Sequence, residues 1–140
     1  MKQAGCNEVD KSMNKMEEFN YTVEQFADLQ LLRYKVYGFE ELSLKQKELI
    51  YYLSQAALQG RDILFDQNGK YNLLIRKMLE TVYTEYQGDR TDVNFVNLET
   101  YLKHIWFSNG IHHHYASDKF VPGFTPEFLR DALNSVDALK

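Results

Sequence analysis

Apolar residues recur at helical spacing in three segments of the chain, and each segment is bounded by polar residues or glycine. The first starts at Ser43, which forms an S-x-x-Q capping box with Gln46, and Gly60 follows its last apolar position. The second covers residues 71–86 and the third residues 95–106. We therefore predict three amphipathic helices, whose apolar stripes are Leu49, Ile50, Leu53, Ala56 and Ala57; Tyr71, Leu74, Ile75, Met78, Leu79, Val82 and Tyr86; and Phe95, Leu98, Leu102, Ile105 and Trp106.

Helix-end signals add a fourth helix near the C-terminus. Thr125 is a suitable N-cap, and Pro126 suits the first helical position. Asn109-Gly110 predicts the end of the third helix, because both residues tolerate the left-handed conformation. The predicted fold class is mainly α, with three to four amphipathic helices joined by aromatic-rich connecting segments. The stripe of the fourth helix consists of Phe128, Leu129, Ala132, Leu133 and Val136.

The remaining segments lack a clear helical period. Residues 25–39 fit either a strand or a short helix, and residues 61–70 are predicted to be a loop with Asn68-Gly69 as its turn. Residues 1–20 have sparse apolar positions, which indicates a disordered polar tail. We therefore divide the chain into this tail and one helical region, residues 21–140.

The tail contains Ala4-Gly5-Cys6, which matches the small-small-Cys ending of a bacterial lipoprotein signal. Only three residues precede Ala4, whereas a signal needs an apolar region of roughly 7–15 residues. The match is either a chance feature of a polar tail or the remnant of a shortened signal. Localisation follows the same choice: cytoplasmic in the first case, lipid-anchored or periplasmic in the second.

Composition excludes some classes of function and leaves others open. The chain has 140 residues, which suits one domain, and aromatic residues make up 14% of it. The net charge of −4 and the lack of a basic run argue against a nucleic-acid partner. No apolar run approaches the roughly 18 residues of a membrane span, and a single cysteine, Cys6, allows no intrachain disulfide.

Motifs of common enzyme classes are missing from the sequence: it has no Gly-rich phosphate loop, G-x-S-x-G, C-x-x-C or H-E-x-x-H. Arg61-Asp62 fits either a buried polar network or a plain loop pair. Trp106-Phe107 is predicted to be core at the end of the third helix. The carboxylates that we expect to be solvated surface rather than acid/base pairs are Glu17-Glu18, Glu40-Glu41 and Asp89.

Three consecutive histidines, His112 to His114, raise the question of a metal site. Adjacent residues point in different directions on a helix, whereas alternate residues share a face on a strand, so only His112 and His114 on an extended segment converge. Zinc would need further ligands, for which His104 and Asp118 are the nearest candidates. The alternatives are a loop with ordinary imidazole hydrogen bonds, or a polar, aromatic-rich pocket wall that holds a peptide backbone or a charged terminus.

Three long stretches in the same order resemble the N-terminal region of bacterial dipeptidyl peptidase III, as found in Bacteroides-type organisms. They are "FADLQLLRYKVYGFEELSLKQKELIYYLSQAALQGRDILFDQN", "ETYLKHIWFSNGIHHHY" and "DKFVPGFTPEFL", and the resemblance runs from about residue 20 to about residue 133. It implies a two-lobed zinc exopeptidase that releases N-terminal dipeptides from short peptides. In that family a His-Glu-x-x-Gly-His helix and a later Glu hold the zinc, and the motif Glu is the general base.

The chain departs from this family in two ways. Family members are several times longer, and no His-Glu-x-x-Gly-His occurs here, so no zinc ligand carries over. We therefore expect an N-terminal fragment that lacks catalytic residues, is inactive alone, and has the missing C-terminal part of the same protein as its partner. The resemblance implies that the segment before "DKFVP" approaches the substrate cleft, with Tyr115 as its lining aromatic. Asn109, His113 and His114 are expected to add polar contacts to substrate.

Two readings from other classes stay open at this point. One is a stand-alone helical interaction module whose exposed aromatics bind a partner. The other is a small metal-binding protein that uses the His112–His114 cluster. A fragment should leave apolar helix faces exposed, so we expect the isolated chain to be marginally stable or to self-associate.

Overall fold

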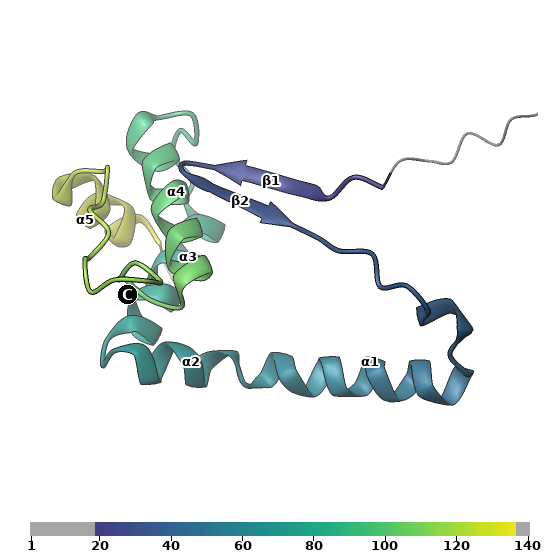
Figure 1. Cartoon of the computed structure of the whole chain (residues 1–140). Coiled ribbons are helices and arrows are strands. Elements are labelled where there is room, and N and C mark those ends of the chain that lie inside the picture. The colour runs from purple at the N-terminus through teal and green to yellow at the C-terminus, as the bar shows by residue number, and fades with distance from the viewer. Residues whose placement is uncertain (1–18, 137–140) are drawn as a thin grey trace, which may run out of the picture. The chain divides into compact units, whose positions relative to one another are not determined.

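The computed structural model of the chain describes residues 19–136, and its fold is mainly α, as predicted (Figure 1). It forms two compact units, one ending at Tyr37 and the other beginning at Gly38. The predicted polar tail, with Cys6 and Glu17-Glu18, lies outside the described residues except for Phe19 and Asn20. In chain order the elements are β1 (Thr22–Phe26), β2 (Leu29–Leu32), the 3-10 helix η1 (Phe39–Glu41), α1 (Leu44–Gln59), α2 (Arg61–Asn68), α3 (Asn72–Glu85), α4 (Val93–Ser108) and α5 (Pro126–Ser135).

The first unit is an antiparallel hairpin of β1 and β2, which shows that strands form in part of the ambiguous segment 25–39. Phe26 pairs with Leu29 across a two-residue turn, in which Ala27 has a positive φ of 47°. The register shifts between Thr22 and Glu24, so the strand carries a bulge there.

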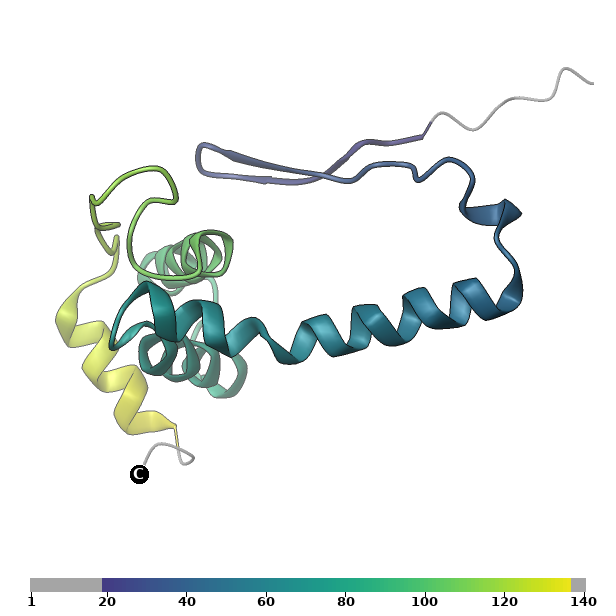
Figure 2. The same cartoon turned by 60° about the horizontal axis from the view of Figure 1, so that its bottom comes forward.

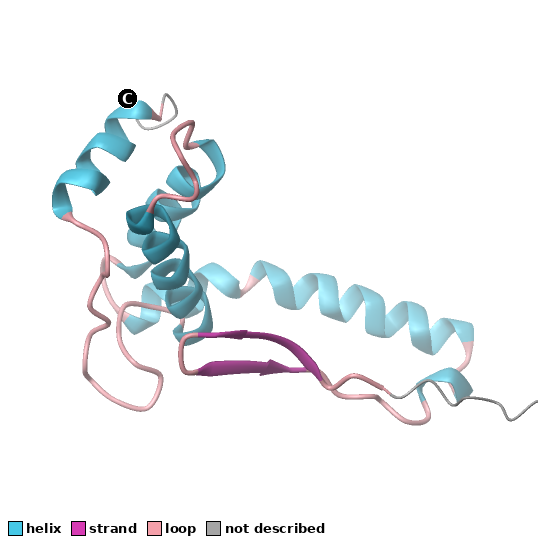
Figure 3. Ribbon diagram, turned by 90° about the horizontal axis from the view of Figure 1, so that it is seen from above, coloured by secondary structure: helices cyan, strands magenta, loops and turns pink. Residues whose placement is uncertain are grey.

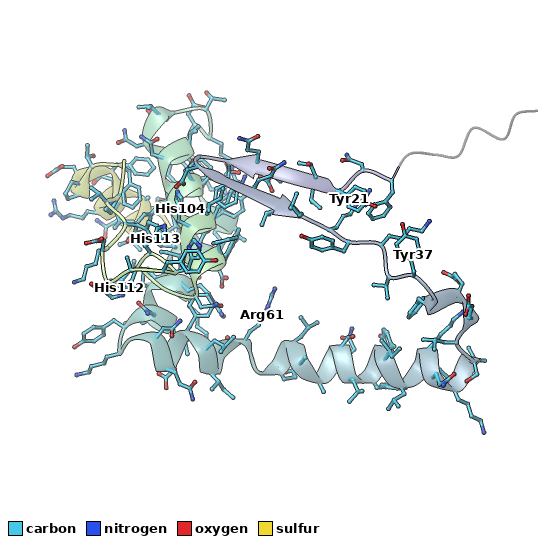
Figure 4. The ribbon with its side chains drawn as sticks, in the orientation of Figure 1. Tyr21, Tyr37, Arg61, His104, His112 and His113 are labelled. Carbon is cyan, nitrogen blue, oxygen red and sulfur yellow. The ribbon has the colours of Figure 1, made fainter. Side chains whose placement is uncertain are left out.

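Tyr21 and Tyr37, both labelled in Figure 4, belong to this hairpin unit. A side-chain hydrogen bond with Tyr37 raises the pKa of Tyr21 above its ordinary value, and repulsion between the two phenolates adds to the effect. The hairpin unit is therefore joined at its open end by side chains as well as by its backbone ladder.

The core of the second unit lies where α2, α3, α4 and α5 meet (Figure 2). The α4 stripe supplies its centre, because Leu98, Leu102 and Ile105 are fully buried. Burying one such side chain stabilises the fold by about 1.5–3 kcal/mol. The predicted stripe of α4 is thus confirmed at its first four positions, Phe95, Leu98, Leu102 and Ile105. The other residues of the core are Phe65, Leu79, Val82, Phe124, Ala132 and Val136.

Helix α1 begins as predicted but does not bury the stripe that predicted it. Ser43 and Gln46 form the expected capping box, with Gln46 N–H donating to Ser43 Oγ. None of the residues Leu44–Gln59 is buried, and Leu53 is 60% exposed. The apolar pattern predicted the helix correctly, but the other described residues of the second unit do not cover its apolar face.

The segment predicted to be a loop, residues 61–70, is largely helix α2, and this prediction was wrong. Gly60 caps α1 in a right-handed helical conformation (φ −78°, ψ −5°), so the chain passes directly into the next helix. Phe65 packs into the core at 3% exposure, and that burial selects the helix over a loop. The predicted turn at Asn68-Gly69 does end α2.

Other apolar predictions also fail at the surface. Tyr71 and Leu74 of the second stripe are exposed, because α3 turns its Leu79 and Val82 face toward the core. Trp106 and Phe107, predicted to be core, are 41% and 36% exposed. Successive residues of a helix point in different directions, so Trp106 lies at the edge of the buried stripe and Phe107 lies on the opposite side of α4.

Surface carboxylates and the last helix follow the sequence prediction. Glu40, Glu41 and Asp89 are exposed, and a hydrogen bond from the Thr91 hydroxyl, followed by one from its backbone N–H, lowers the pKa of Asp89. Thr125 caps α5 by accepting from the Phe128 N–H at 3.2 Å.

Within residues 19–136, the helices are all too short or too polar to cross a membrane.

Candidate functional site: the loop after helix α4

The candidate site is the connection between α4 and α5, residues 109–124, which we call the histidine loop (pink in Figure 3). Asn109 adopts the left-handed conformation (φ 54°, ψ 35°) and caps α4. The Gly110 N–H then donates to the Ile105 carbonyl at 3.1 Å. The prediction that Asn109-Gly110 ends the third helix is confirmed.

Two asparagines at the α2–α3 connection hold the start of this loop. Asn68 Nδ2 donates to the Asn109 carbonyl at 3.2 Å, and Asn72 Oδ1 accepts from the Ile111 N–H at 3.4 Å. Asn72 is only 2% exposed. A Cβ on Gly110 would collide with the Asn72 side-chain amide, so glycine is required where the two segments meet.

The histidine loop then folds back on itself as a short hairpin. The Phe120 N–H donates to the Ile111 carbonyl at 2.9 Å, and the His113 N–H donates to the Asp118 carbonyl at 2.8 Å. His112 pairs with Lys119 as an isolated antiparallel bridge. These bonds fix the backbone of the histidine run, so its side chains have defined positions although they lie outside regular helix or strand.

The aromatic rings of the loop form one group of ring contacts, in which His113 and His114 are stacked. The His113 and His114 centroids are 4.5 Å apart at 26°, and the Tyr115 ring follows 4.0 Å from His114. Phe107 of α4 meets His114 edge-on at 4.9 Å. Tyr115 remains 88% exposed. The Tyr115 N–H donates to His113 Nδ1 at 3.3 Å, so the neutral His113 ring carries its proton on Nε2.

A fourth histidine, His104, reaches the same region from α4 (Figure 4). Its ring stacks on Phe120 at 4.7 Å, and His113 also approaches Phe120, at 6.0 Å. His104 therefore supports the histidine loop by ring packing.

A polar pocket of about 350 Å³ lies between the loop and the α2–α3 connection. Two buried polar atoms of its lining residues, Asn72 Nδ2 and Ser108 Oγ, have no hydrogen-bond partner among the described residues. Buried polar atoms are normally paired. These two atoms are themselves buried, so they lie within the wall of the pocket and not at its accessible surface. The residues that line the pocket are Asn68, Asn72, Ser108, Gly110, His112, His113, His114, Ala116 and Ser117.

The sequence-predicted site residues are brought together only in part. His113 and His114 line the pocket, and Asn109 lies next to it and offers its carbonyl to Asn68. Tyr115 does not line the pocket; its ring contacts His114 at a tilt of 50° and projects from the surface.

Sequence reasoning missed the three polar residues of α2, α3 and α4 that complete the pocket. Asn72 had a detectable signal, because it falls on the same helical face as Ile75, Leu79 and Val82, where a polar residue is unusual. Asn68 was noticed only as a turn residue, and Ser108 had no signal of its own.

The residues present do not fit a metal ion held by this loop. His113 and His114 stack face to face, which directs their ring nitrogens away from a common point. Within residues 19–136, no three His, Cys, Asp or Glu side chains come close enough together to hold a metal ion. The zinc that the family resemblance implies has no ligand set in this part of the chain.

No protein-family model and no curated protein matches the chain. The resemblance to dipeptidyl peptidase III therefore rests on the quoted stretches of sequence. What the structure adds is the arrangement of those stretches: the second and third meet in the histidine loop, and the end of the first, at Asn68, holds the loop's base.

Proposed function

We propose that this chain is the N-terminal portion of a zinc-dependent dipeptidyl peptidase, in which the histidine loop forms part of the wall that binds short peptides. The observation that carries the proposal is the polar pocket of the loop beside the projecting Tyr115 ring. A peptide offers backbone donors and acceptors beside apolar side chains, and this pair of features matches both. Zinc and the general base belong to the remainder of the enzyme.

The exposed face of α1 supports the need for a further partner. Leu49 and Leu53 are 58% and 60% exposed on a helix with no buried residue. A contiguous apolar face of this kind marks an interaction surface. In the proposed enzyme the remainder of the same protein covers it.

The test is enzymatic and uses the protein produced from its complete coding sequence. Release of N-terminal dipeptides from short peptides should require zinc and stop when a chelator removes it. Tyr115→Ala should lower kcat/KM by about 2- to 10-fold, the range expected for one aromatic contact. Val121→Ala is the matched control, because Val121 is equally exposed on the same loop. Unchanged kinetics for Tyr115→Ala would remove Tyr115 from the binding wall, and a zinc-independent or absent activity would overturn the proposal as a whole.

A stand-alone helical interaction module is the second candidate, and the exposure of α1 also favours it. Amide hydrogen exchange separates the two. In a peptidase, α1 should be protected in the complete protein and exchange quickly in the 140-residue chain. Equal, fast exchange in both would favour the module.

A further inference from the structure

A second pocket, of about 480 Å³, lies on a different side of the second unit, between α2, α3 and α4. Its apolar lining comes from Leu58, Phe65 and Trp106. Its polar lining comes from two arginines and two carboxylates, Arg61, Arg76, Asp62 and Glu80. The volume is within the range of small-molecule sites, and the mixed lining is typical of them.

Most of the charges in this pocket are already paired. Arg76 Nη2 donates to Asp62 Oδ1 at 2.7 Å, and Arg76 Nε lies 3.3 Å from Glu80 Oε1. Lys77 Nζ reaches the other Asp62 oxygen at 3.2 Å, and Trp106 Nε1 donates to Glu80 Oε1 at 2.7 Å. Asp62 therefore has a cation at each of its two oxygens, and Glu80 has a cation and a donor at Oε1.

This network also makes the pocket rigid. The Arg76 guanidinium lies 4.5 Å over the Phe65 ring, and its side chain is only 12% exposed. The pair of Asp62 and Arg76 ties α2 to α3, and the indole bond to Glu80 ties α3 to α4. The pair of Arg76 and Glu80 lies within α3. The wall of the pocket is consequently held in place by contacts from three helices before any ligand arrives.

Arg61 is the exception. It opens α2 and lines the pocket, yet its guanidinium has no carboxylate partner among residues 19–136. Figure 4 shows its side chain extending away from the chain at the α1–α2 junction. Because the neighbouring acids are neutralised by Arg76 and Lys77, Arg61 carries the unbalanced positive charge of the pocket. A planar guanidinium with several free donors is matched best by a carboxylate, which it can bind with two parallel hydrogen bonds.

We propose that this pocket binds a carboxylate attached to an apolar body: Arg61 pairs with the carboxylate, and Trp106 with Phe65 and Leu58 contacts the apolar part. A cation is disfavoured because the pocket's acids are already paired, and a wholly apolar ligand would leave Arg61 and the polar wall unmatched. This site shares no lining residue with the histidine loop pocket, so the inference goes beyond the proposed peptidase function and does not depend on it.

Trp106 makes the test specific, since it is the single tryptophan of the chain and lines this pocket. Tryptophan fluorescence of the 140-residue chain is titrated with four probes. N-acetylphenylalanine has a carboxylate and an amide, and 3-phenylpropanoate has a carboxylate without an amide. N-acetylphenylalanine amide and phenethylamine have no carboxylate. Saturable changes are expected with the first two only. A response to N-acetylphenylalanine but not to 3-phenylpropanoate would assign the site to peptide C-termini, and equal responses would assign it to apolar carboxylates in general.

Substitution of Arg61 completes the test. Arg61→Gln should weaken the binding of both carboxylates by about tenfold or more, whereas Arg61→Lys should retain part of it because the charge is kept. Arg130→Gln is the matched control, an exposed arginine on α5 away from the pocket. Circular dichroism checks that each variant keeps the helical content of the parent chain. No saturable change with either carboxylate, an equal response to the amide, or an unchanged affinity in Arg61→Gln would overturn the inference.

Discussion

Helices α1 and α4 are the most instructive pair in the molecule. Each has 16 residues, each begins at a side-chain cap, and each carries an apolar stripe at helical spacing. The stripe of α4 lies at the centre of the core, whereas no residue of α1 is buried. The same pattern therefore predicts a helix in both cases, but it does not say whether the chain itself supplies the surface that covers the helix.

The difference has a structural cause. α4 packs against α3, and the Tyr86 ring contacts both Phe95 of α4 and Phe128 of α5, at 5.1 and 5.8 Å. α1 continues into α2 without a reversal of direction, since Gly60 keeps a helical conformation. Its apolar face is thus carried away from the core that the rest of the unit forms.

The largest expected effect tests this contrast directly. Leu102→Ala should destabilise the chain by about 2–5 kcal/mol, because it leaves a cavity at a fully buried position. Leu53→Ala, on the exposed face of α1, should change the free energy of unfolding by less than about 0.5 kcal/mol. Denaturant unfolding followed by circular dichroism measures both. A comparable cost for Leu53→Ala, rising with protein concentration, would mean that α1 is covered by a second copy in solution.

A smaller effect is expected at the end of α4. Gly110→Ala places a methyl group against the Asn72 amide, so overpacking should cost about 1–3 kcal/mol. Gly38→Ala is the control: its added Cβ meets no atom within 4 Å, although its φ of 83° is strained for alanine. The midpoints of thermal or denaturant unfolding are measured for the Gly110→Ala and Gly38→Ala variants. If Gly110→Ala costs no more than Gly38→Ala, the Asn72 contact does not fix the histidine loop.

The two helix caps sharpen the comparison further. Asp92→Ala removes the acceptor of the Asn94 N–H, at 2.8 Å, and should lower the stability of the core unit by about 0.5–2 kcal/mol. Ser43→Ala removes the equivalent cap of α1. Because α1 is not packed on the core, the second change should reduce helical content without moving the core transition. Helicity and Trp106 fluorescence separate the two signals, and a shift of the fluorescence midpoint in Ser43→Ala would show that α1 and the core unfold together.

The smallest expected effect is on the pH dependence of stability, and it concerns Asp62, close to the junction where α1 passes into α2. Hydrogen bonds from Arg76 and then Lys77 lower the pKa of Asp62 below its ordinary value of 3.8. The unfolded chain therefore binds this proton more readily, so the stabilisation is complete above pH 3.8 and is lost as pH falls through the lower pKa of the folded state. Asp62→Asn should flatten the loss of stability in that acid range.

Denaturant midpoints measured between neutral pH and the acid range provide the readout for Asp62. Asp66→Asn is the matched control, on the same helix, exposed, and without an ion pair among residues 19–136. If Asp66→Asn flattens the acid limb as much as Asp62→Asn does, the Arg76 and Lys77 contacts are not the source of the pH dependence.

The sequence predicted the two ends of the histidine loop, but it did not predict the polar residues from other parts of the chain that line the pocket. Asn109-Gly110 and Thr125-Pro126 marked both ends of the histidine loop, because caps depend on local backbone chemistry. Asn68, Asn72 and Ser108 come from three other places along the chain. Their meeting depends on how α2 and α3 pack against α4, which no local pattern encodes. The loop predicted at residues 61–70 was wrong for the same reason, since the burial of Phe65 selects helix there.

The sequence by itself determined where α1 and α5 begin, where α4 ends and which helix faces are apolar, because caps and periodicity act within a few residues. Tertiary structure alone decided which apolar faces are covered: α4 lies in the core, while the stripe of α1 and the rings of Trp106 and Tyr115 remain exposed. It also decided that His113 and His114 stack and that Arg61 is left without a carboxylate partner within residues 19–136. These outcomes depend on contacts between residues far apart in the chain, and such contacts form only when the whole unit packs.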